Sequence, residues 1–263
     1  MNSLFDQLNP KERRGSKPRC HLLTHGSTED VGVKLTNLVS PFASIAPTDR
    51  WMPQGFDQKD EAELHKAIRL LGDEHCAQIR DWWFAIFRGG RQKGPSFDIA
   101  STCTIEGRLG ILLVEAKAHD KELINEEGAK PLKKGASDGQ ITNHRRIGVE
   151  INEANKPFSK ATKVTWELSR DSRYQMSNRF ASACKLVGLG YPVVLVYLGF
   201  LNADEMTDLG KPFESAGQWA KLVKSHSEPL FPAAIWDNRW TLNSVPFIPL
   251  IRALEIPLTK KTE

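Results

Sequence analysis

The chain has 263 residues, 40% of them hydrophobic and 26% charged, which is the ordinary balance of a globular protein and enough chain to bury a sizeable core. No window approaches the roughly 18 consecutive apolar residues of a membrane span, and the stretch MNSLFDQLNPKERRGSKPRC lacks the apolar segment of a secretory signal, so we expect a cytoplasmic protein. The net charge is +4, and the four cysteines have neither metal-ligand spacing nor the density of a disulfide scaffold.

The N-terminal stretch differs in pattern from the rest of the chain. Residues 1–57 are rich in Pro, Gly, Ser and Thr and show no sustained hydrophobic period, which predicts an irregular arm. Residues 58–263 alternate helix-like and strand-like patterns, without an internal repeat or a low-complexity tract. The sequence therefore predicts an N-terminal arm followed by a single α/β domain.

Two helices are predicted at the start of this domain. Residues 59–72 carry apolar side chains at helical spacing, and the glycine that ends this stretch is a suitable helix stop. Residues 73–87 follow with a broad apolar face that includes two tryptophans. The apolar positions of the first helix are Leu64, Ile68 and Leu71.

A β-hairpin follows the Gly-rich break RGGRQKGP. Residues 96–105 and 111–117 are two runs of strand-forming residues joined by a short Gly-containing turn, the pattern of two antiparallel strands. A long polar connection, residues 118–169, comes next, and connections of this length are usually functional or mobile.

The hairpin is followed by a helix and a further strand. Residues 171–188 show an apolar stripe that ends at a glycine, and VVLVYLGF at residues 193–200 is apolar on both faces, as in a central parallel strand. Strand, helix and strand in this order form a βαβ unit with parallel strands and a right-handed crossover. We therefore expect an α/β fold with a central mixed sheet flanked by helices.

The second hairpin strand ends in an unusual way, because GILLVEAKAH runs from four aliphatic residues into a carboxylate and an ammonium group. Since side chains alternate along a strand, Glu115 and Lys117 share one face. A turn centred on residues 106–109 would place Asp98 opposite Lys117 and beside Glu115. Two carboxylates without His or Cys suit a hard cation, Mg²⁺ first and Mn²⁺ second, and a lysine beside a phosphate can position water or stabilise charge.

Asp98, a hairpin, Glu115-Ala116-Lys117, and then a helix and a buried strand together resemble the PD-(D/E)XK nuclease superfamily, which has the restriction-endonuclease-like fold. The resemblance covers roughly residues 59–200 and implies a divalent metal on Asp98 and Glu115 and metal-dependent hydrolysis of phosphodiester bonds. Lys117 would position the attacking water. The proline usually written directly before the aspartate is here Pro95, three residues earlier.

The resemblance also implies two supporting residues. Many members add an acid on the helix before the sheet, and Glu61 is the candidate here, with Glu63 as the alternative. Many also carry a polar residue on the following helix. Gln175 matches it, and Asn178 and Arg179 are on the same turn.

The charge is unevenly distributed, since residues 117–185 hold fourteen Lys and Arg against nine Asp and Glu. A locally basic segment suits a polyanionic partner. Together with the resemblance it favours nucleic acid as the partner, and DNA over RNA. Arg145, Arg146 and Arg179 are the candidate phosphate contacts. A homodimer or a larger defence or repair complex is compatible with this reading.

Two other interpretations stay open at this point. The chain could be a non-catalytic or partner-dependent module that binds nucleic acid or regulates while keeping the nuclease fold. Alternatively, Glu115 and Lys117 could form a same-face ion pair where a strand surfaces in water, a pair worth about 0–1 kcal/mol that needs no function.

Overall fold

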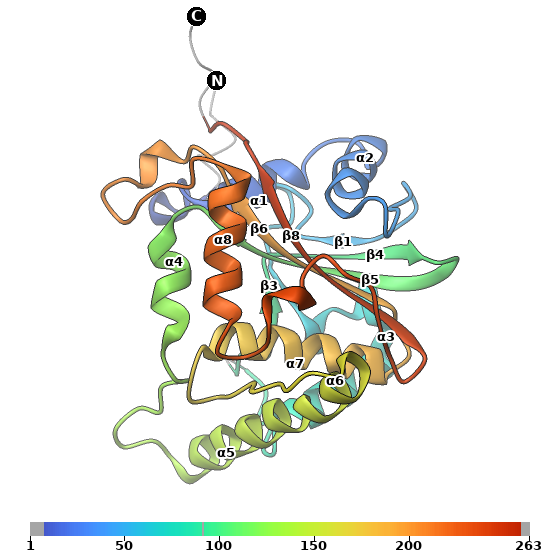
Figure 1. Ribbon diagram of the computed structural model, residues 1–263, viewed down its shortest axis with the longest axis vertical. Helices are drawn as coiled ribbons and strands as arrows, with labels where there is room; N and C mark the ends of the chain where they lie inside the picture. Colours follow the sequence, from blue (N-terminus) through green and yellow to red (C-terminus); the bar gives the residue numbers. More distant parts are fainter. Residues whose placement is uncertain (1–7, 91, 259–263) are drawn as a thin grey trace, which may run out of the picture.

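A computed structural model describes residues 8–90 and 92–258 of the chain. Its centre is a mixed six-stranded sheet in the order β1-β4-β5-β6-β8-β7, flanked by helices on both faces (Figure 1). The expected α/β architecture with a central mixed sheet is therefore confirmed. The strands of this sheet are β1 (Trp51–Met52), β4 (Ile99–Ile105), β5 (Arg108–Lys117), β6 (Val193–Phe200), β7 (Trp240–Leu242) and β8 (Val245–Leu254).

The predicted hairpin is formed by β4 and β5, but its turn is tighter than expected. Glu106 and Gly107 have φ angles of 51° and 74°, the left-handed values of a two-residue hairpin turn, so Ile105 pairs with Arg108. The register is therefore shifted by two residues from the expected one. Continuing it past the last pair places Asp98 opposite Glu115, and the expected pairing of Asp98 with Lys117 is wrong.

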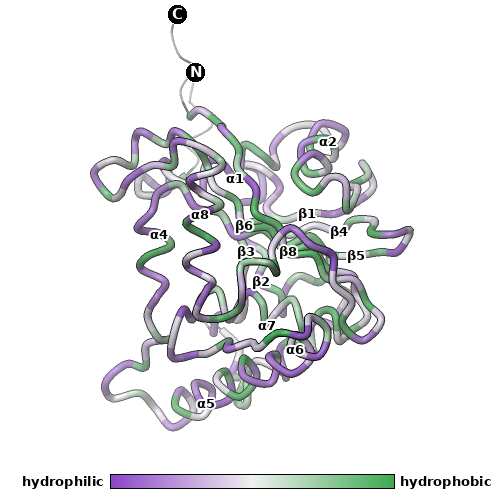
Figure 2. The backbone as a smooth tube through the Cα atoms, in the orientation of Figure 1, coloured by the Kyte–Doolittle hydropathy of each residue, from purple (hydrophilic) through white to green (hydrophobic). Residues whose placement is uncertain are grey.

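The predicted βαβ unit is present. Strand β6 runs parallel to β5, and helix α7 (Tyr174–Gly188) connects them. All eight residues of β6 are buried, as its apolar sequence predicts for a strand between two parallel neighbours. Figure 2 shows these central strands as the most hydrophobic part of the backbone.

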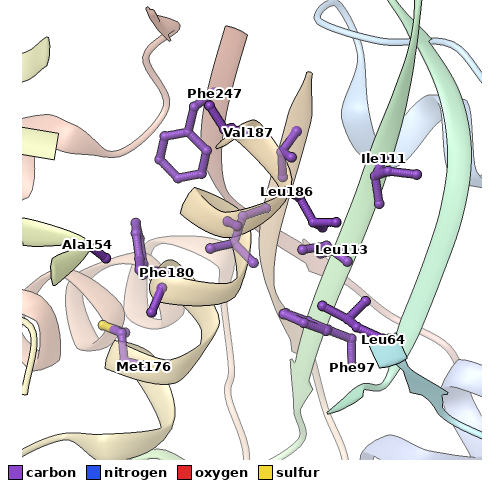
Figure 3. Packing of buried hydrophobic residues seen from close by; sticks show 14 of the residues in the cluster. Leu64, Phe97, Ile111, Leu113, Ala154, Met176, Phe180, Leu186, Val187 and Phe247 are labelled. Atoms are coloured by element: carbon purple, nitrogen blue, oxygen red, sulfur yellow. The ribbon is translucent and has the colours of Figure 1, made fainter. Parts of the chain in front are cut away.

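One face of the sheet is covered by α3 (Ile68–Trp83) and the helices that follow β5, and its core surrounds α7. Figure 3 shows Leu113 of β5 and Phe97 on one side of α7, with Phe180 and Met176 projecting from the helix itself. Helices α4 and α8 lie side by side at the end of the sheet where β5 stops (Figure 1). The helices after β5 are α4 (Asp120–Ile124), α5 (Asp138–Glu153), α6 (Asn155–Thr162), α7 and α8 (Ala216–Ser227).

The other face is covered by the N-terminal stretch, where the prediction of irregular structure is wrong. Helices α1 (Ser16–Leu23) and α2 (Thr28–Val39) pack there against the sheet (Figure 1). Ser27 caps the N-terminus of α2, and its side chain accepts a hydrogen bond from the Asp30 N–H. Its buried stripe repeats at helical spacing, a signal that the high content of Pro, Gly, Ser and Thr around it conceals. The stripe is Val31, Leu35 and Leu38.

The prediction of a helix over residues 59–72 is also wrong for the part before Ile68, where α3 begins. Strand β2 (Ala62–Glu63) pairs there with β3 (Ser96–Phe97), and the Gly94 N–H in the loop before β3 donates to the Glu63 carboxylate. Ile68 is 52% exposed, so the apolar face expected for this helix does not exist. Helix α3 spans the boundary between the two predicted helices, and Gly72, with φ 74°, interrupts it at the predicted stop.

The connection of residues 118–169 forms three of the helices named above, α4 to α6, and the sequence had not assigned them. Within residues 8–90 and 92–258, the helices are too short or too polar to cross a lipid bilayer.

We expect Gly199→Ala to destabilise the fold by about 1–3 kcal/mol, because a Cβ at Gly199 would stand 2.6 Å from the buried ring of Trp219, which packs across the end of β6. Gly188→Ala at the end of α7 is the matched control, since a Cβ there meets nothing within 4 Å, and this variant should differ from the wild type by less than about 1 kcal/mol. Urea unfolding measures both. Equal midpoints for the two variants would contradict the packing described for Trp219.

Candidate functional site

The site begins at the end of β5, where Glu115 and Lys117 lie on the same face as predicted. The Lys117 Nζ atom is 2.7 Å from Glu115 Oε1. Strand alternation sends the intervening Ala116 to the opposite face, into the core beneath α1. Glu115 is 2% and Lys117 6% exposed, so β5 does not surface in water at this point. The interpretation as a solvated surface ion pair is therefore wrong.

Asp98 reaches the site from the bend between β3 and β4. Its Oδ2 atom accepts a hydrogen bond of 2.7 Å from the backbone N–H of Ala116, the residue between Glu115 and Lys117. This bond fixes the carboxylate against β5. Asp98 keeps part of its surface exposed, whereas Glu115 and Lys117 are buried, so Asp98 lies on the solvent side of the group.

Glu115 is the centre of the hydrogen-bond network. Gln175 Nε2 donates to its Oε1 at 2.6 Å, and Arg179 Nε donates to its Oε2 at 2.5 Å. Gln175 and Arg179 are four residues apart in α7, so both project from the same side of this helix. The Arg179 guanidinium also lies 4.9 Å from the centre of the Phe97 ring. With Lys117, three nitrogen donors occupy the two oxygens of Glu115.

Glu126 joins the site from the short helical turn after α4, and sequence reasoning missed it. It forms an ion pair with Lys117, and its side chain is only 7% exposed. Its Oε2 atom is buried without a hydrogen-bond partner, and so is the hydroxyl of Tyr197. Tyr197 is the residue of β6 that stands next to Glu115 in the β5–β6 strand register. No spacing rule would single out Glu126, because it lies in a polar connection and reaches Lys117 only through the path of α4.

Burial and charge shift the acidities of this group in opposite directions. Burial and then the charge of Glu115 raise the pKa of Asp98 to about 8, and burial raises the pKa of Glu126 to about 7. Burial acts to raise the pKa of Glu115 too, but the charges of Arg179 and Lys117 outweigh it and lower this pKa to about 2. The result is one permanently ionised carboxylate between two carboxyls that titrate near neutrality.

Lys117 stays charged in this environment. Burial acts to lower the pKa of its ammonium group, but the charges of Glu115 and Glu126 outweigh burial and hold the pKa above its ordinary value. The same balance, with Glu115 as the main partner, raises the pKa of Arg179. Both groups are therefore fixed positive charges at neutral pH.

The supporting acids are placed less centrally than expected. Glu61 lies in the loop before β2 rather than on a helix, is exposed, and its Oε1 is 3.5 Å from Lys17 Nζ. Its charge raises the pKa of Asp98 slightly, as the last of several causes. Glu63 is bound to Lys66 and to the Gly94 N–H.

The arginines expected to contact nucleic acid have different surroundings. Arg145 is exposed on α5, while Arg146 pairs with Glu150 and donates to the carbonyl of Trp82, which ties α5 to α3. Arg179 is 8% exposed and its Nε is hydrogen-bonded to Glu115, so in this arrangement its guanidinium faces the site and not the surface. Asn178, one residue earlier, donates to the Tyr174 hydroxyl.

The donor set has the chemistry for a hard divalent cation but not a complete cage. Three carboxyls, Asp98, Glu115 and Glu126, face two cations, Lys117 and Arg179, and burial raises the pKa of both Asp98 and Glu126. Oxygen ligands of this kind suit Mg²⁺, which keeps several waters and often takes only one or two protein carboxylates. Within the described ranges, no three Asp, Glu, His or Cys side chains are already arranged around a common ion position.

Comparison with known proteins gives no relative from which a function could be inferred, so the functional argument rests on the geometry of the site. No family model, no curated protein and no solved structure matches the chain. The described residues form an α/β protein whose mixed central sheet carries a buried cluster of carboxyls and cations at one end.

We expect Glu115→Gln to lower the free energy of unfolding by about 3–5 kcal/mol, because it leaves two buried cations without their shared carboxylate. Glu127→Gln is the control, since Glu127 is 52% exposed and its contact with Arg173 is 3.8 Å long, so the change should cost less than about 1 kcal/mol. Urea unfolding at pH 7 measures both. A small loss for Glu115→Gln would contradict the buried network.

Asp98→Asn should stabilise the protein in the presence of a chelator, and more at pH 8 than at pH 5. The folded protein holds the Asp98 proton up to a pKa of about 8, whereas the ordinary value is 3.8, so the contribution of this group to stability falls as the pH rises between these values. Asparagine resembles the protonated acid and avoids this loss. Thermal melting of Asp98→Asn and of the exposed control Asp57→Asn at both pH values tests it. An increment that shrinks from pH 5 to pH 8 would contradict the raised pKa.

Proposed function

We propose that this protein is a Mg²⁺-dependent nuclease that hydrolyses phosphodiester bonds. DNA is the favoured substrate over RNA. The single observation that carries the proposal is the meeting of Asp98, Glu115 and Lys117 at the end of the β4–β5 hairpin. These are the residues on which the resemblance to the PD-(D/E)XK nucleases rests, and the preference for DNA comes from that resemblance alone.

The topology around the site supports the finer assignment to the restriction-endonuclease-like fold. An antiparallel hairpin, a crossover helix and a parallel strand follow each other as β4, β5, α7 and β6. Gln175 from the crossover helix bonds Glu115, which is the position expected for a supporting polar residue. The helical acid that many members carry has no counterpart at Glu61, which is in a loop.

The proposed roles follow from the charges of the groups. Asp98 and Glu115 would hold Mg²⁺, or Mn²⁺ in its place, and the bound ion would supply Lewis-acid stabilisation of the phosphate charge. Lys117 is held as an ammonium group between two carboxylates, so it acts as a fixed positive charge beside the phosphate and not as a base. Glu126, with a pKa of about 7 and one unpaired oxygen, has the acidity of a group that accepts a proton from water near neutral pH.

The described arrangement is a closed form of such a site. Both oxygens of Glu115 already accept bonds from Gln175, Lys117 and Arg179. Binding of a cation to Glu115 therefore requires that one of these donors give up its contact. Arg179 or Lys117, once released, would carry its positive charge toward the substrate phosphate.

A second candidate function is a non-catalytic or partner-dependent module that keeps this fold. The observation that favours it is the same saturation of Glu115, since a carboxylate fully bonded to protein donors can serve structure alone. Calorimetric titration with Mg²⁺ and Mn²⁺ separates the two functions. Heat that disappears in Asp98→Asn supports the nuclease, and no heat from either ion supports the module.

We expect the purified protein to cleave nucleic acid with Mg²⁺, and Lys117→Ala to lower kcat by about 100- to 1000-fold because a fixed positive charge at the phosphate is lost. Lys121→Ala, in the exposed part of α4, should leave kcat unchanged. Single- and double-stranded DNA and RNA are the substrates, and circular dichroism verifies that each variant is folded. A folded wild type that cleaves none of them with either Mg²⁺ or Mn²⁺ would overturn the nuclease assignment.

A further inference from the structure

We infer that a single nucleic-acid strand lies along two adjoining cavities that share Lys93 and pass beside Asp98. We call this path the lysine track, defined by Lys17, Lys59, Lys66, Lys93, Lys130 and Lys133. The inference rests on the proposed function and names the surface that would hold the substrate.

The first cavity, of about 520 Å³, lies between the loops around β2 and the start of β3. Its wall includes Ser96, two residues before Asp98 in the chain, and Glu61, whose charge reaches the Asp98 carboxyl. Four lysines line it, drawn from the N-terminal helix α1, the loops around β2 and the loop before β3. They are Lys17, Lys59, Lys66 and Lys93.

The second cavity, of about 290 Å³, continues from Lys93 along the loop that precedes α5. Lys130 and Lys133 line it, and no acidic residue does. The Lys130 Nζ atom donates to the Tyr174 hydroxyl at 3.0 Å. Since Tyr174 directly precedes Gln175, which bonds Glu115, this wall leads to the other side of the same site.

The charge of the track distinguishes it from the cavity beside α5. Its six lysines face three lining acids, Asp60, Glu61 and Glu63. Glu63 is bound to Lys66 and a backbone N–H, and Lys17 is paired with Glu61 and with Glu12. The positive charge is therefore concentrated in the second cavity, which Lys93, Lys130 and Lys133 line without any acidic residue. A cavity of about 540 Å³ beside α5 instead balances Arg145 and Arg170 against Glu153 and Asp171. An excess of positive charge beside a candidate phosphodiester site fits a phosphate backbone.

The dimensions of the track favour one strand over a duplex. Both cavities are near the size range of small-ligand pockets, about 300–1,000 Å³, and this is the scale of a few nucleotides. The reacting groups also lie deep, with Glu115 and Lys117 buried, so a strand that can enter a hollow reaches them more readily than one held in a double helix.

The test measures the binding of a labelled single-stranded DNA by fluorescence anisotropy. EDTA is present so that no cleavage occurs. Lys93→Ala/Lys133→Ala removes two exposed lysines of the track, and Lys160→Ala/Lys221→Ala removes two exposed lysines that line neither cavity. We expect the track variant to bind about tenfold more weakly. The slope of log K against log salt concentration should become shallower by about 1.4, since each lost phosphate contact on a single strand removes about 0.7. The control variant should bind like the wild type.

Three results would overturn the track: equal affinities for the track and control variants, tighter binding of the duplex of the same sequence, or equal competition by poly-glutamate, which would indicate an acidic protein partner. Binding that depends on Lys93 and Lys133 without any cleavage in Mg²⁺ would uphold the track and reject the nuclease. Cleavage that both lysine variants perform at the wild-type rate would uphold the nuclease and reject the track.

Discussion

The structure of the site depends on keeping one carboxylate ionised inside the protein. Glu115 is 2% exposed near the end of the central strand β5, where an unpaired charge would cost several kcal/mol. Arg179 and Lys117 compensate this charge, and Gln175 completes the hydrogen bonds of its oxygens. Helix α7 must therefore cross the sheet where both of its polar side chains reach Glu115. Glu126 supplies a second carboxylate to Lys117, because Glu115 is shared between Lys117 and Arg179.

This requirement links stability to the proposed chemistry. The contacts that make Glu115 tolerable in the interior are the ones that a metal ion would have to replace in part. The two neighbouring carboxyls, Asp98 and Glu126, lack such compensation, because burial raises their pKa values and disfavours their ionised forms near neutral pH. A cation at the site would relieve both. The cluster is thus stable as a closed network and has the surplus of acidic groups that a divalent ion could compensate.

Local patterns were sufficient for the elements that carry the site, but not for their alignment. Alternation along β5 predicted the shared face of Glu115 and Lys117, and the run of apolar residues predicted β6 as a central parallel strand. The hairpin register was wrong by two residues, because it depends on the length of a turn whose residues tolerate several conformations. The helix expected over residues 59–72 failed for a similar reason: helical spacing of three apolar residues does not exclude the strand pairing that β3 supplies.

The sequence by itself determined the hairpin, the crossover helix and the shared face of Glu115 and Lys117, because strand alternation and helix periodicity are local properties of the chain. Asp98 and Gln175 joined this group only through the assumed turn and the resemblance to the nuclease superfamily. Only the tertiary structure decided that Glu126 and Arg179 complete the charge balance, that α1 and α2 close the second face of the sheet, and that lysines far apart in the chain line adjoining cavities. These features depend on which loops meet at the end of the sheet. That meeting is set by the packing of the whole chain, which no local period encodes.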